Sequence, residues 1–325
     1  KVSIIIPNYN HATFLKERLD SVFNQTFQDF ELILLDDASS DDSIDILKLY
    51  KNNNKVSQLI LNEYNSGSPF NQWIKGINIA SGEYIWIAES DDVASLDFLE
   101  ETLKFAKSKD DLGLVFVSSQ IIDTHSHFVK NITKPLNKTT GFTIKSLEEI
   151  SIYLVKKLCI LNVSSVLFKA SVLKSLNFPI LSKFKNTGDR FTYLQVALKS
   201  KIYFLDKELN YFRSHENNLT SENIQNLNIY FDRLRIIKYL IPIFKDNKKA
   251  IENLKSFYIE QIVLCKKRDF VVESQKINFK MYKTKLIDII LFSKISLFNF
   301  LIYLFKNAMP SRIINYFKQQ VLINH

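Results

Sequence analysis

The stretch "YIWIAESDD", from Tyr84 to Asp92, decides how this chain is interpreted. Five mostly apolar residues run directly into the carboxylates of Glu89, Asp91 and Asp92. Such an apolar run is typical of a buried strand, whereas unpaired carboxylates are costly to remove from water. We therefore expect the strand to end at a site where acidic side chains are used.

The same alternation of apolar runs and helical patterns extends over the first 120 residues. Strands are predicted at Val2–Ile6, Glu31–Leu35, Val56–Leu61, Tyr84–Ala88 and Leu112–Val117. Helices are predicted at Ala12–Phe23, Ser43–Tyr50, Phe70–Ala80 and Leu96–Lys107. This order predicts right-handed crossovers and an α/β fold with a Rossmann-like, mainly parallel sheet.

Ligands of such sheets bind outside the carboxyl ends of the strands. The segments that leave those ends are Pro7–Asn10, Asp36–Asp42 and Glu89–Asp92, and two of them are acidic. Two acidic loops in one crevice repel each other unless a cation lies between them. Mg²⁺ or Mn²⁺ shared with a phosphate fits this requirement. The glycine-rich phosphate loops G-x-G-x-x-G and G-x-x-x-x-G-K-[ST] are missing, so a pyrophosphate would be neutralised by metal.

Several motifs occur in an order that resembles a known family. They are "VSIIIPNYN" (2–10), "QTFQDFELILLDDASSDDS" (25–43), "GINIASGEYIWIAESDD" (76–92) and "TGDRFTYLQVALKSKIYFLDKELNYFRSHENNLT" (187–220). Together they resemble an inverting family 2 glycosyltransferase of the glycosyltransferase A fold, of the bacterial surface-polysaccharide type. The resemblance covers roughly Val2 to Thr220.

The resemblance implies a set of site residues. A nucleotide pocket would be lined by Pro7, Tyr9, Asn10, Asp36, Asp37, Asn65, Gln72 and Ser90. Mn²⁺ or Mg²⁺ would bind Asp91 of a D-x-D motif, with Glu89 in its first position and His215 approaching the metal or diphosphate. Asp189 would be the general base. Glu89 replaces the usual first aspartate, and Gln72-Trp73 replaces a frequent Arg-Asn pair, which leaves the donor sugar open.

The implied reaction is metal-dependent transfer of a sugar from a nucleotide sugar, expected to be UDP-linked, to a saccharide acceptor. One alternative is a sugar nucleotidyltransferase, although that class normally has a glycine-rich basic loop after the first strand. The other is a catalytically silent scaffold that binds nucleotide sugars. The acidic residues could also simply cap helices, and His215 could be a lone surface histidine. His11, His125 and His127 show no ligand spacing.

Charge divides the chain into a predicted catalytic domain, residues 1–225, and a basic, mainly helical region, residues 226–325. The latter holds 18 Lys and Arg against 7 Asp and Glu, whereas the rest of the chain has a net charge of −2. All six glycines lie at or before Gly188. No recognised nucleic-acid module is present, so nucleic acid is not an expected partner.

The apolar run Leu286–Phe305 is interrupted by Asp288, Lys294 and Asn299. We expect it to lie in the interface of an anionic membrane rather than to span the bilayer. The acceptor would then be a lipid-linked saccharide. A helical subdomain or a homodimer contact is the alternative. Two distant cysteines and the lack of a visible secretory leader predict a cytoplasmic protein. The expected interfacial segment would make it peripheral on the inner face of the membrane.

Overall fold

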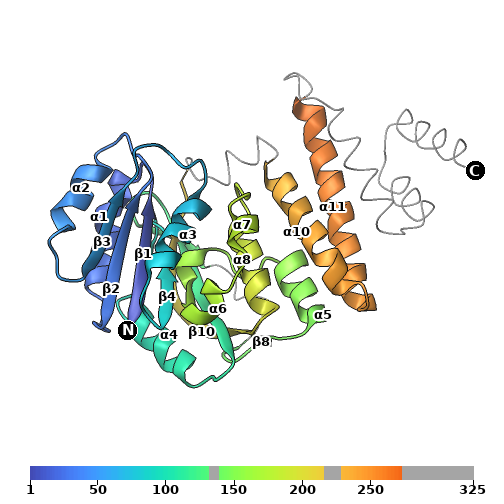
Figure 1. Cartoon of the computed structure of the whole chain (residues 1–325). Coiled ribbons are helices and arrows are strands. Elements are labelled where there is room, and N and C mark those ends of the chain that lie inside the picture. The colour runs from blue at the N-terminus through green and yellow to red at the C-terminus, as the bar shows by residue number, and fades with distance from the viewer. Residues whose placement is uncertain (132–138, 216–227, 273–325) are drawn as a thin grey trace, which may run out of the picture. The chain divides into compact units, whose positions relative to one another are not determined.

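The computed structural model describes residues 1–131, 139–215 and 228–272 (Figure 1). Residues 1–265 form one compact unit, and residues 266–325 form a second unit, of which residues 266–272 are described. The predicted interfacial segment Leu286–Phe305 lies outside the described residues. Among the described helices, none is long and apolar enough to cross a membrane. The predicted division between residues 225 and 226 stays a prediction.

The strands are β1 (Val2–Asn8), β2 (Phe30–Asp36), β3 (Val56–Leu61), β4 (Tyr84–Ile87), β5 (Val93–Ala94), β6 (Leu112–Ile122), β7 (Phe128–Asn131), β8 (Thr143–Ile144), β9 (Val166–Lys169) and β10 (Lys201–Arg213). The α-helices are α1 (Ala12–Phe23), α2 (Ser43–Tyr50), α3 (Pro69–Ile79), α4 (Phe98–Lys107), α5 (Leu147–Ile150), α6 (Ala170–Lys174), α7 (Phe178–Leu181), α8 (Gly188–Ala197), α10 (Asn228–Phe244) and α11 (Lys248–Val272). A π-helical turn, η2 (Ser151–Lys156), and a 3₁₀ turn, η3 (Val163–Ser165), complete the elements.

One twisted sheet with the order β3-β2-β1-β4-β9-β6-β10-β5 runs through the fold, with β7 paired to β6 and β8 to β10. β1 is parallel to β2 and β4, β2 to β3, and β6 to β10. β9 is antiparallel to both of its neighbours, β4 and β6. The strands β1 to β4, β6 and β10 therefore run in one direction, which confirms the predicted mainly parallel α/β fold.

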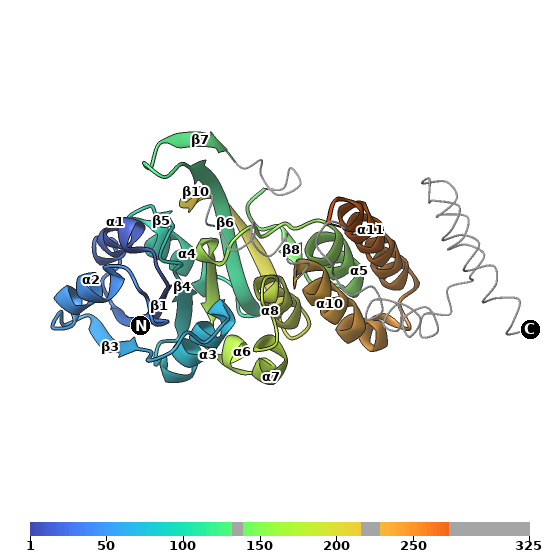
Figure 2. The same cartoon turned by 90° about the horizontal axis from the view of Figure 1, so that it is seen from above.

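Helices cover both faces of this sheet (Figures 1 and 2). On one face, Val2, Ile4 and Ile6 of β1 belong to a buried cluster that includes side chains of α1, α2 and α4. On the other face, Ile5 lies against Gly76 of α3 so closely that a Cβ there would be 2.5 Å from its side chain. Successive side chains of β1 thus point to opposite faces of the sheet and pack against different helices, as strand geometry requires.

The predicted elements of the first 120 residues are confirmed, with differences at their ends. The helix predicted from Leu96 begins at Phe98, because β5 (Val93–Ala94) and a turn come first. The strand predicted at Leu112–Val117 continues to Ile122, where β10 pairs with it. The short β9, which separates β4 from β6, was not predicted.

The register of the sheet brings the predicted loops to one edge. Asn8 pairs with Asp36 at the carboxyl ends of β1 and β2. Ile5 pairs with Ile87, the last residue of β4. The segments after β2, β1 and β4 therefore emerge side by side, which places them where ligands bind in sheets of this kind.

A buried carboxylate joins the amino-terminal ends of the strands, at the opposite end of the sheet from these loops. Glu31 of β2 accepts hydrogen bonds from Ser3 Oγ at 2.5 Å, Ser81 N at 2.7 Å and Ser81 Oγ at 2.8 Å, and pairs with Lys1 Nζ at 3.2 Å. Burial opposes ionisation of Glu31, but these donors outweigh it and lower its pKa to about 2. Gly82 is required beside them, because a Cβ there would lie 2.5 Å from the backbone nitrogen of Ser3.

We predict that Glu31→Gln lowers the free energy of unfolding at pH 7 by about 1–3 kcal/mol, the scale for hydrogen bonds to a charged group. The folded-state pKa of Glu31 is depressed, so its stabilisation is complete above its unfolded pKa and is lost as pH falls towards about 2. Urea unfolding at pH 7 and pH 4 should therefore show a smaller difference from the wild type at pH 4. Exposed Glu83→Gln is the matched control, and equal losses in both variants would contradict this account.

Candidate active site

Asp36 links the loop after β2 to the end of β1 through hydrogen bonds. Its Oδ2 accepts a hydrogen bond from Asn8 Nδ2 at 2.8 Å and from Ser39 Oγ at 2.6 Å, and its Oδ1 accepts from Ser39 N at 2.8 Å. Asp36 is fully buried. Its carboxylate is thus committed to the loops that surround the crevice.

Asp37 lies at the centre of a second set of contacts. Its Oδ1 accepts hydrogen bonds from Asn62 Nδ2 at 2.7 Å, Ser66 N at 2.9 Å and Gln72 Nε2 at 2.7 Å. Its Oδ2 accepts one, from Ser66 Oγ at 2.8 Å. Each carboxylate oxygen can accept about two hydrogen bonds, so Oδ2 keeps capacity for a further donor. The buried Oε1 of Gln72 has no hydrogen-bond partner among the described residues.

The remaining predicted nucleotide residues lie around the same loops. Pro7 is buried in β1, and Tyr9 is 48% exposed just beyond it. Asn10 has a left-handed backbone, φ 54°, and its Oδ1 accepts a hydrogen bond from Ser40 N at 2.7 Å. Asn65 donates to the backbone oxygen of Asp37 at 3.2 Å. Ser90 belongs to the neighbouring acidic loop.

Two buried arginines hold that acidic loop, Glu89–Asp92, by its backbone. Arg18 Nε of α1 donates to the carbonyl oxygen of Glu89 at 2.7 Å, and Arg213 Nε of β10 donates to that of Asp91 at 2.8 Å. Both arginine side chains are fully buried. They bring two positive charges to a loop that carries three carboxylates.

Asp92 faces inward and has structural partners. Its Oδ1 accepts a hydrogen bond from Arg213 N at 3.0 Å, its Oδ2 accepts one from Asn162 Nδ2 at 2.7 Å, and Arg18 Nη2 lies 3.9 Å away. Burial and the charge of Asp91 raise the pKa of Asp92 to about 6. The loop continues into β5, and α4 begins only at Phe98, so neither Asp91 nor Asp92 caps that helix.

Glu89 points to the aromatic side of the crevice. Its Oε1 accepts a hydrogen bond from Trp73 Nε1 at 2.8 Å, and Trp73 makes an edge contact with Phe70. Burial, followed by the charges of Asp91 and Asp92, raises the pKa of Glu89 to about 8. A carboxyl group with such a pKa is largely protonated at neutral pH. Trp73 and Phe70 are both buried.

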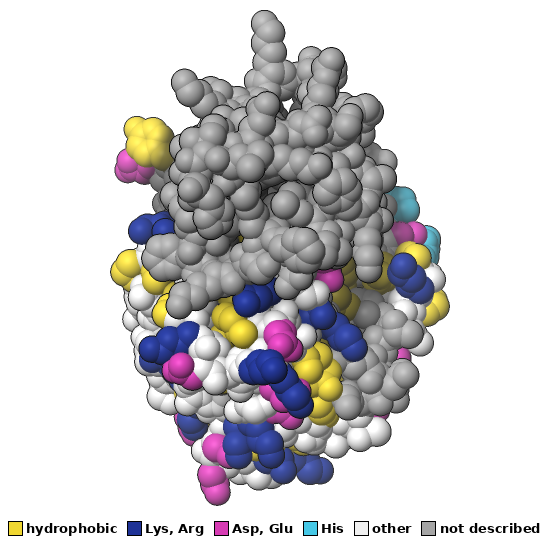
Figure 3. Space-filling model, turned by 90° about the vertical axis from the view of Figure 1, so that its right-hand side faces the viewer, with side chains coloured by type: hydrophobic (Ala, Val, Ile, Leu, Met, Phe, Trp, Pro, Cys, Tyr) yellow, Lys and Arg dark blue, Asp and Glu magenta, His cyan; other side chains and the backbone are white. Residues whose placement is uncertain are grey.

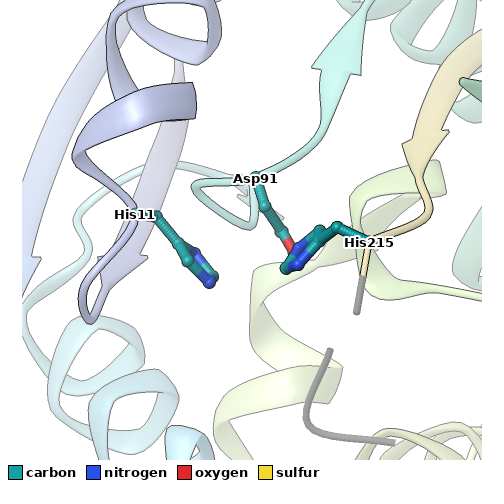
Figure 4. A group of neighbouring side chains, drawn as sticks. All are labelled: His11, Asp91 and His215. Carbon is teal, nitrogen blue, oxygen red and sulfur yellow. The ribbon is translucent and has the colours of Figure 1, made fainter. Parts of the chain in front are cut away.

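Asp91 lies between two histidines (Figure 4). His215, just after β10, places Nε2 3.1 Å from Asp91 Oδ2, and one ligand atom from each of His11, Asp91 and His215 lies within 4.8 Å of the others. Burial opposes ionisation of Asp91, but the hydrogen bond from His215 and the charge of His11 hold its pKa below the ordinary value. This is a donor set that can hold a divalent cation.

His11 was not expected here, because sequence spacing showed no ligand pattern for it. It is the N-cap residue of α1, three residues after the end of β1, and its Nδ1 lies 2.8 Å from Ser90 Oγ of the acidic loop. Burial lowers the pKa of His11, while the charge of Asp91 acts in the opposite direction. The available signal was its position at the carboxyl end of β1. His215 is not a lone surface residue, since its side chain is only 5% exposed.

Asp189 lies in the first turn of α8, and Thr187 is the N-cap residue of that helix. Burial raises the pKa of Asp189 to about 6, although backbone hydrogen bonding and the charge of Arg190 act in the opposite direction. Tyr193 lies four residues further along α8, on the same face of the helix as Asp189, and is fully buried. Burial raises its pKa well above the ordinary value. The predicted base is therefore a partly buried carboxylate with an elevated pKa.

The fold and these loops identify the class of protein. Residues 3–163 match the family model described as "Glycosyl transferase family 2". Residues 3–163 therefore form a domain of this family of glycosyltransferases, and the sequence resemblance is confirmed.

Curated relatives extend this assignment. The chain is 29% identical over 215 residues to a poly(ribitol-phosphate) beta-glucosyltransferase of Bacillus spizizenii, covering 65% of this chain and 32% of the relative. It is 31% identical over 179 residues to an uncharacterized glycosyltransferase of Methanocaldococcus jannaschii, covering 54% of this chain and 58% of that one. It thus spans less than two thirds of both. The poly(ribitol-phosphate) beta-N-acetylglucosaminyltransferase TarP of Staphylococcus aureus is 25% identical and is matched over 85% of its length.

Solved structures share the fold. The S. aureus TarS fragment 1–349 in complex with UDP-GlcNAc has a TM-score of 0.62 at 20% identity, covering 86% of this chain and 77% of that one. The mannosyltransferase PcManGT of Pyrobaculum calidifontis, in complex with GDP-Man and Mn²⁺, has a TM-score of 0.56 at 13% identity, covering 89% of this chain and 80% of that one. At these identities the likeness concerns the fold alone.

We predict that Asp92 and Asp91 differ in their effect on stability. Asp92→Ala leaves the buried donors Arg213 N and Asn162 Nδ2 without their acceptor, so it should lower the free energy of unfolding by about 2 kcal/mol or more. Asp91→Ala loses one hydrogen bond, to His215, but also removes the repulsion between Asp91 and Asp92, so it should change the free energy of unfolding by less than about 1 kcal/mol. Urea unfolding of both variants at pH 7 tests this, and equal destabilisation would contradict the inward role of Asp92.

Proposed function

We propose that this chain transfers a sugar, with inversion, from a UDP-linked donor to a hydroxyl group of a saccharide acceptor, and that it requires a divalent metal ion. The observation that carries the proposal is the group formed by His11, Asp91 and His215 at the sheet edge where the nucleotide loops meet. The family assignment agrees with it. A UDP-GlcNAc complex among the structural neighbours supports a UDP-linked donor.

The donor set fits a metal ion. One carboxylate and two imidazoles suit Mn²⁺ better than Mg²⁺, which prefers oxygen ligands. The contact between His11 Nδ1 and Ser90 Oγ orients the ring and leaves Nε2 as the ligand nitrogen. When bound, the ion would supply positive charge that stabilises the leaving diphosphate. Glu89 lies outside this group of three. We place it beside the metal site, without a direct bond to the ion.

The loops after β1 and β2 would bind the nucleotide. The second acceptor site of Asp37 Oδ2 suits the N–H of a uracil ring, and Gln72 Oε1 offers a further acceptor. Exposed Tyr9 would cover the base, and Asn10 and Asn65 would shape the loop around it. Asp36 would act indirectly, by holding these loops together.

Asp189 would accept the proton of the attacking hydroxyl group. A pKa of about 6 keeps the carboxylate ionised at neutral pH and still makes it more basic than an exposed aspartate. Burial beside Tyr193 limits the water that could compete with the acceptor. The acceptor proposed is a saccharide or a lipid-linked saccharide in polysaccharide biosynthesis, which the names of the relatives support.

Two other proposals concern the whole protein. We propose a cytoplasmic location, peripheral on the inner face of the membrane, with a homodimer as the alternative use of the C-terminal region. On the face shown in Figure 3, basic and acidic side chains of the described residues are intermixed. The membrane proposal is supported by the sequence of the basic C-terminal region, residues 226–325. The alternatives are a sugar nucleotidyltransferase and a silent scaffold, and the family assignment favours a glycosyltransferase over both.

We predict that the full chain hydrolyses or transfers from a UDP-sugar in a panel of nucleotide sugars and that the activity needs Mn²⁺. Chelation should abolish it, and Asp91→Ala should lower it by at least about 10²-fold, because a ligand at the developing charge is lost. Exposed Asp29→Ala is the control. Release of UDP from the UDP-sugar identifies a transferase, whereas formation of pyrophosphate from UTP and a sugar 1-phosphate, without release of UDP, would identify a nucleotidyltransferase.

We further predict that Asp189→Asn retains UDP binding but loses about 10²-fold or more in kcat, the scale for a positioned general base. In the wild type, kcat should fall as pH drops through about 6, because the carboxylate becomes protonated there. Calorimetric titration with UDP and a pH–rate profile measure the two effects. A variant that loses UDP affinity and keeps its turnover would give Asp189 a donor-binding role instead.

A further inference from the structure

A carboxylate from helix α10 holds the loop that leads into α8. Asp232 is fully buried, and its Oδ2 accepts hydrogen bonds from three successive backbone N–H groups, of Lys185 at 2.9 Å, Asn186 at 2.7 Å and Thr187 at 3.1 Å. Its Oδ1 accepts from Arg235 Nη1 at 2.7 Å. Successive amides that converge on one anion form a rigid nest, and a buried carboxylate persists only when it is paired in this way.

The three amides immediately precede Gly188 and Asp189, the first two residues of α8. On the opposite side, a Cβ on Gly188 would lie 2.7 Å from the ring of Phe70 in α3. The start of α8 is therefore held both by the carboxylate of Asp232 in α10 and by the ring of Phe70 in α3.

The same loop also reaches the nucleotide side of the crevice. Lys185 Nζ donates to the carbonyl oxygen of Gly67 at 2.7 Å, and Ser68 Oγ donates to that of Phe184 at 2.8 Å. Ser66, next to them, contacts the carboxylate of Asp37. One loop thus connects α10 with both the proposed base and the proposed nucleotide pocket.

Helix α8 packs directly on the C-terminal helices. Phe191 makes an edge contact with Tyr239 of α10 at 5.0 Å between ring centroids, and the guanidinium of Arg190 lies 5.6 Å from the ring of Phe257 in α11. The charged groups that act on Asp189 are Arg190 on its own helix and Asp232 on α10. The negative charge of Asp232 adds to burial in raising the pKa of Asp189.

We propose that Asp232 is a positioning residue for the transfer reaction, which it supports by fixing the loop 185–187 and, through it, the orientation of Asp189. Helix α10 then contributes to catalysis through this contact. The proposal rests on the proposed function of Asp189 as the general base.

The test uses the full chain and compares kcat, donor KM and the pH–rate profile of Asp232→Asn with those of the wild type. We expect kcat to fall by about 10- to 100-fold, the scale for a misplaced catalytic group. Donor KM should stay within about threefold, because Asn62 and Gln72 still hold Asp37 in the nucleotide pocket. The lost interaction is then one made in the transition state and not in donor binding. The acid limb should move to lower pH, because a negative charge next to Asp189 is removed. The limb thus reports the charge of Asp232, whereas a fall in kcat per folded molecule at unchanged donor KM reports the position of Asp189.

Two further variants separate charge from position. Asp232→Glu keeps the charge but displaces the carboxylate, so kcat should fall while the acid limb stays near the wild-type pH. It also serves if Asp232→Asn fails to fold. Glu252→Gln, an exposed acid on α11, makes the same charge change away from the loop and should leave both quantities unchanged.

The outcomes are distinguishable. A wild-type kcat and acid limb in Asp232→Asn, or a loss of activity that only follows the folded fraction measured by circular dichroism, overturns the positioning role. Asp189→Asn is measured in the same assay. If Asp189→Asn loses its kcat while Asp232→Asn keeps the wild-type kcat, only the role of Asp232 is rejected. If Asp189→Asn retains wild-type turnover, the proposed function fails and this proposal fails with it.

Discussion

The site depends on two buried guanidinium groups, those of Arg18 and Arg213. Each donates to a backbone carbonyl of the acidic loop, at Glu89 and Asp91. Without them the fold would have to hold the carboxylates of Asp91 and Asp92 in a partly buried turn with no guanidinium group beside them, which is unfavourable by several kcal/mol per ion. Because the arginines bind carbonyl oxygens, they leave the carboxylate of Asp91 available. They come from α1 and β10, so the loop forms only when distant parts of the chain have folded.

This arrangement gives three neighbouring carboxyl groups different properties. Asp92 is turned inward to backbone and amide donors, Glu89 is held by Trp73 and has a raised pKa, and Asp91 has a lowered pKa beside His215. Separated pKa values among neighbouring acids are typical of functional sites. The parallel register of β1, β2 and β4 then brings this loop beside the loops around Asp37, which is the general advantage of a doubly wound sheet for binding ligands.

Much of this could be predicted where the signal is local. The apolar stripe of Ala12–Phe23 predicts a helix with the observed bounds. The acidic residues after β4 predict the end of the sheet where the loops converge. Three features could not be predicted, because they depend on contacts between distant residues. His11 meets His215 across the crevice, β9 inserts antiparallel between β4 and β6, and Asp232 reaches the loop before α8. Spacing along a chain carries no record of such contacts.

The most direct test of the account is the position of the metal ion relative to this loop. Crystals of the full chain grown with UDP and Mn²⁺ would give an anomalous difference map that locates manganese without reference to activity. The account predicts one peak at coordination distance from the carboxylate of Asp91 and from His11 and His215, next to the diphosphate, with Arg18 and Arg213 still bound to the loop carbonyls. Manganese held by the diphosphate alone, or by residues outside this group, would contradict it.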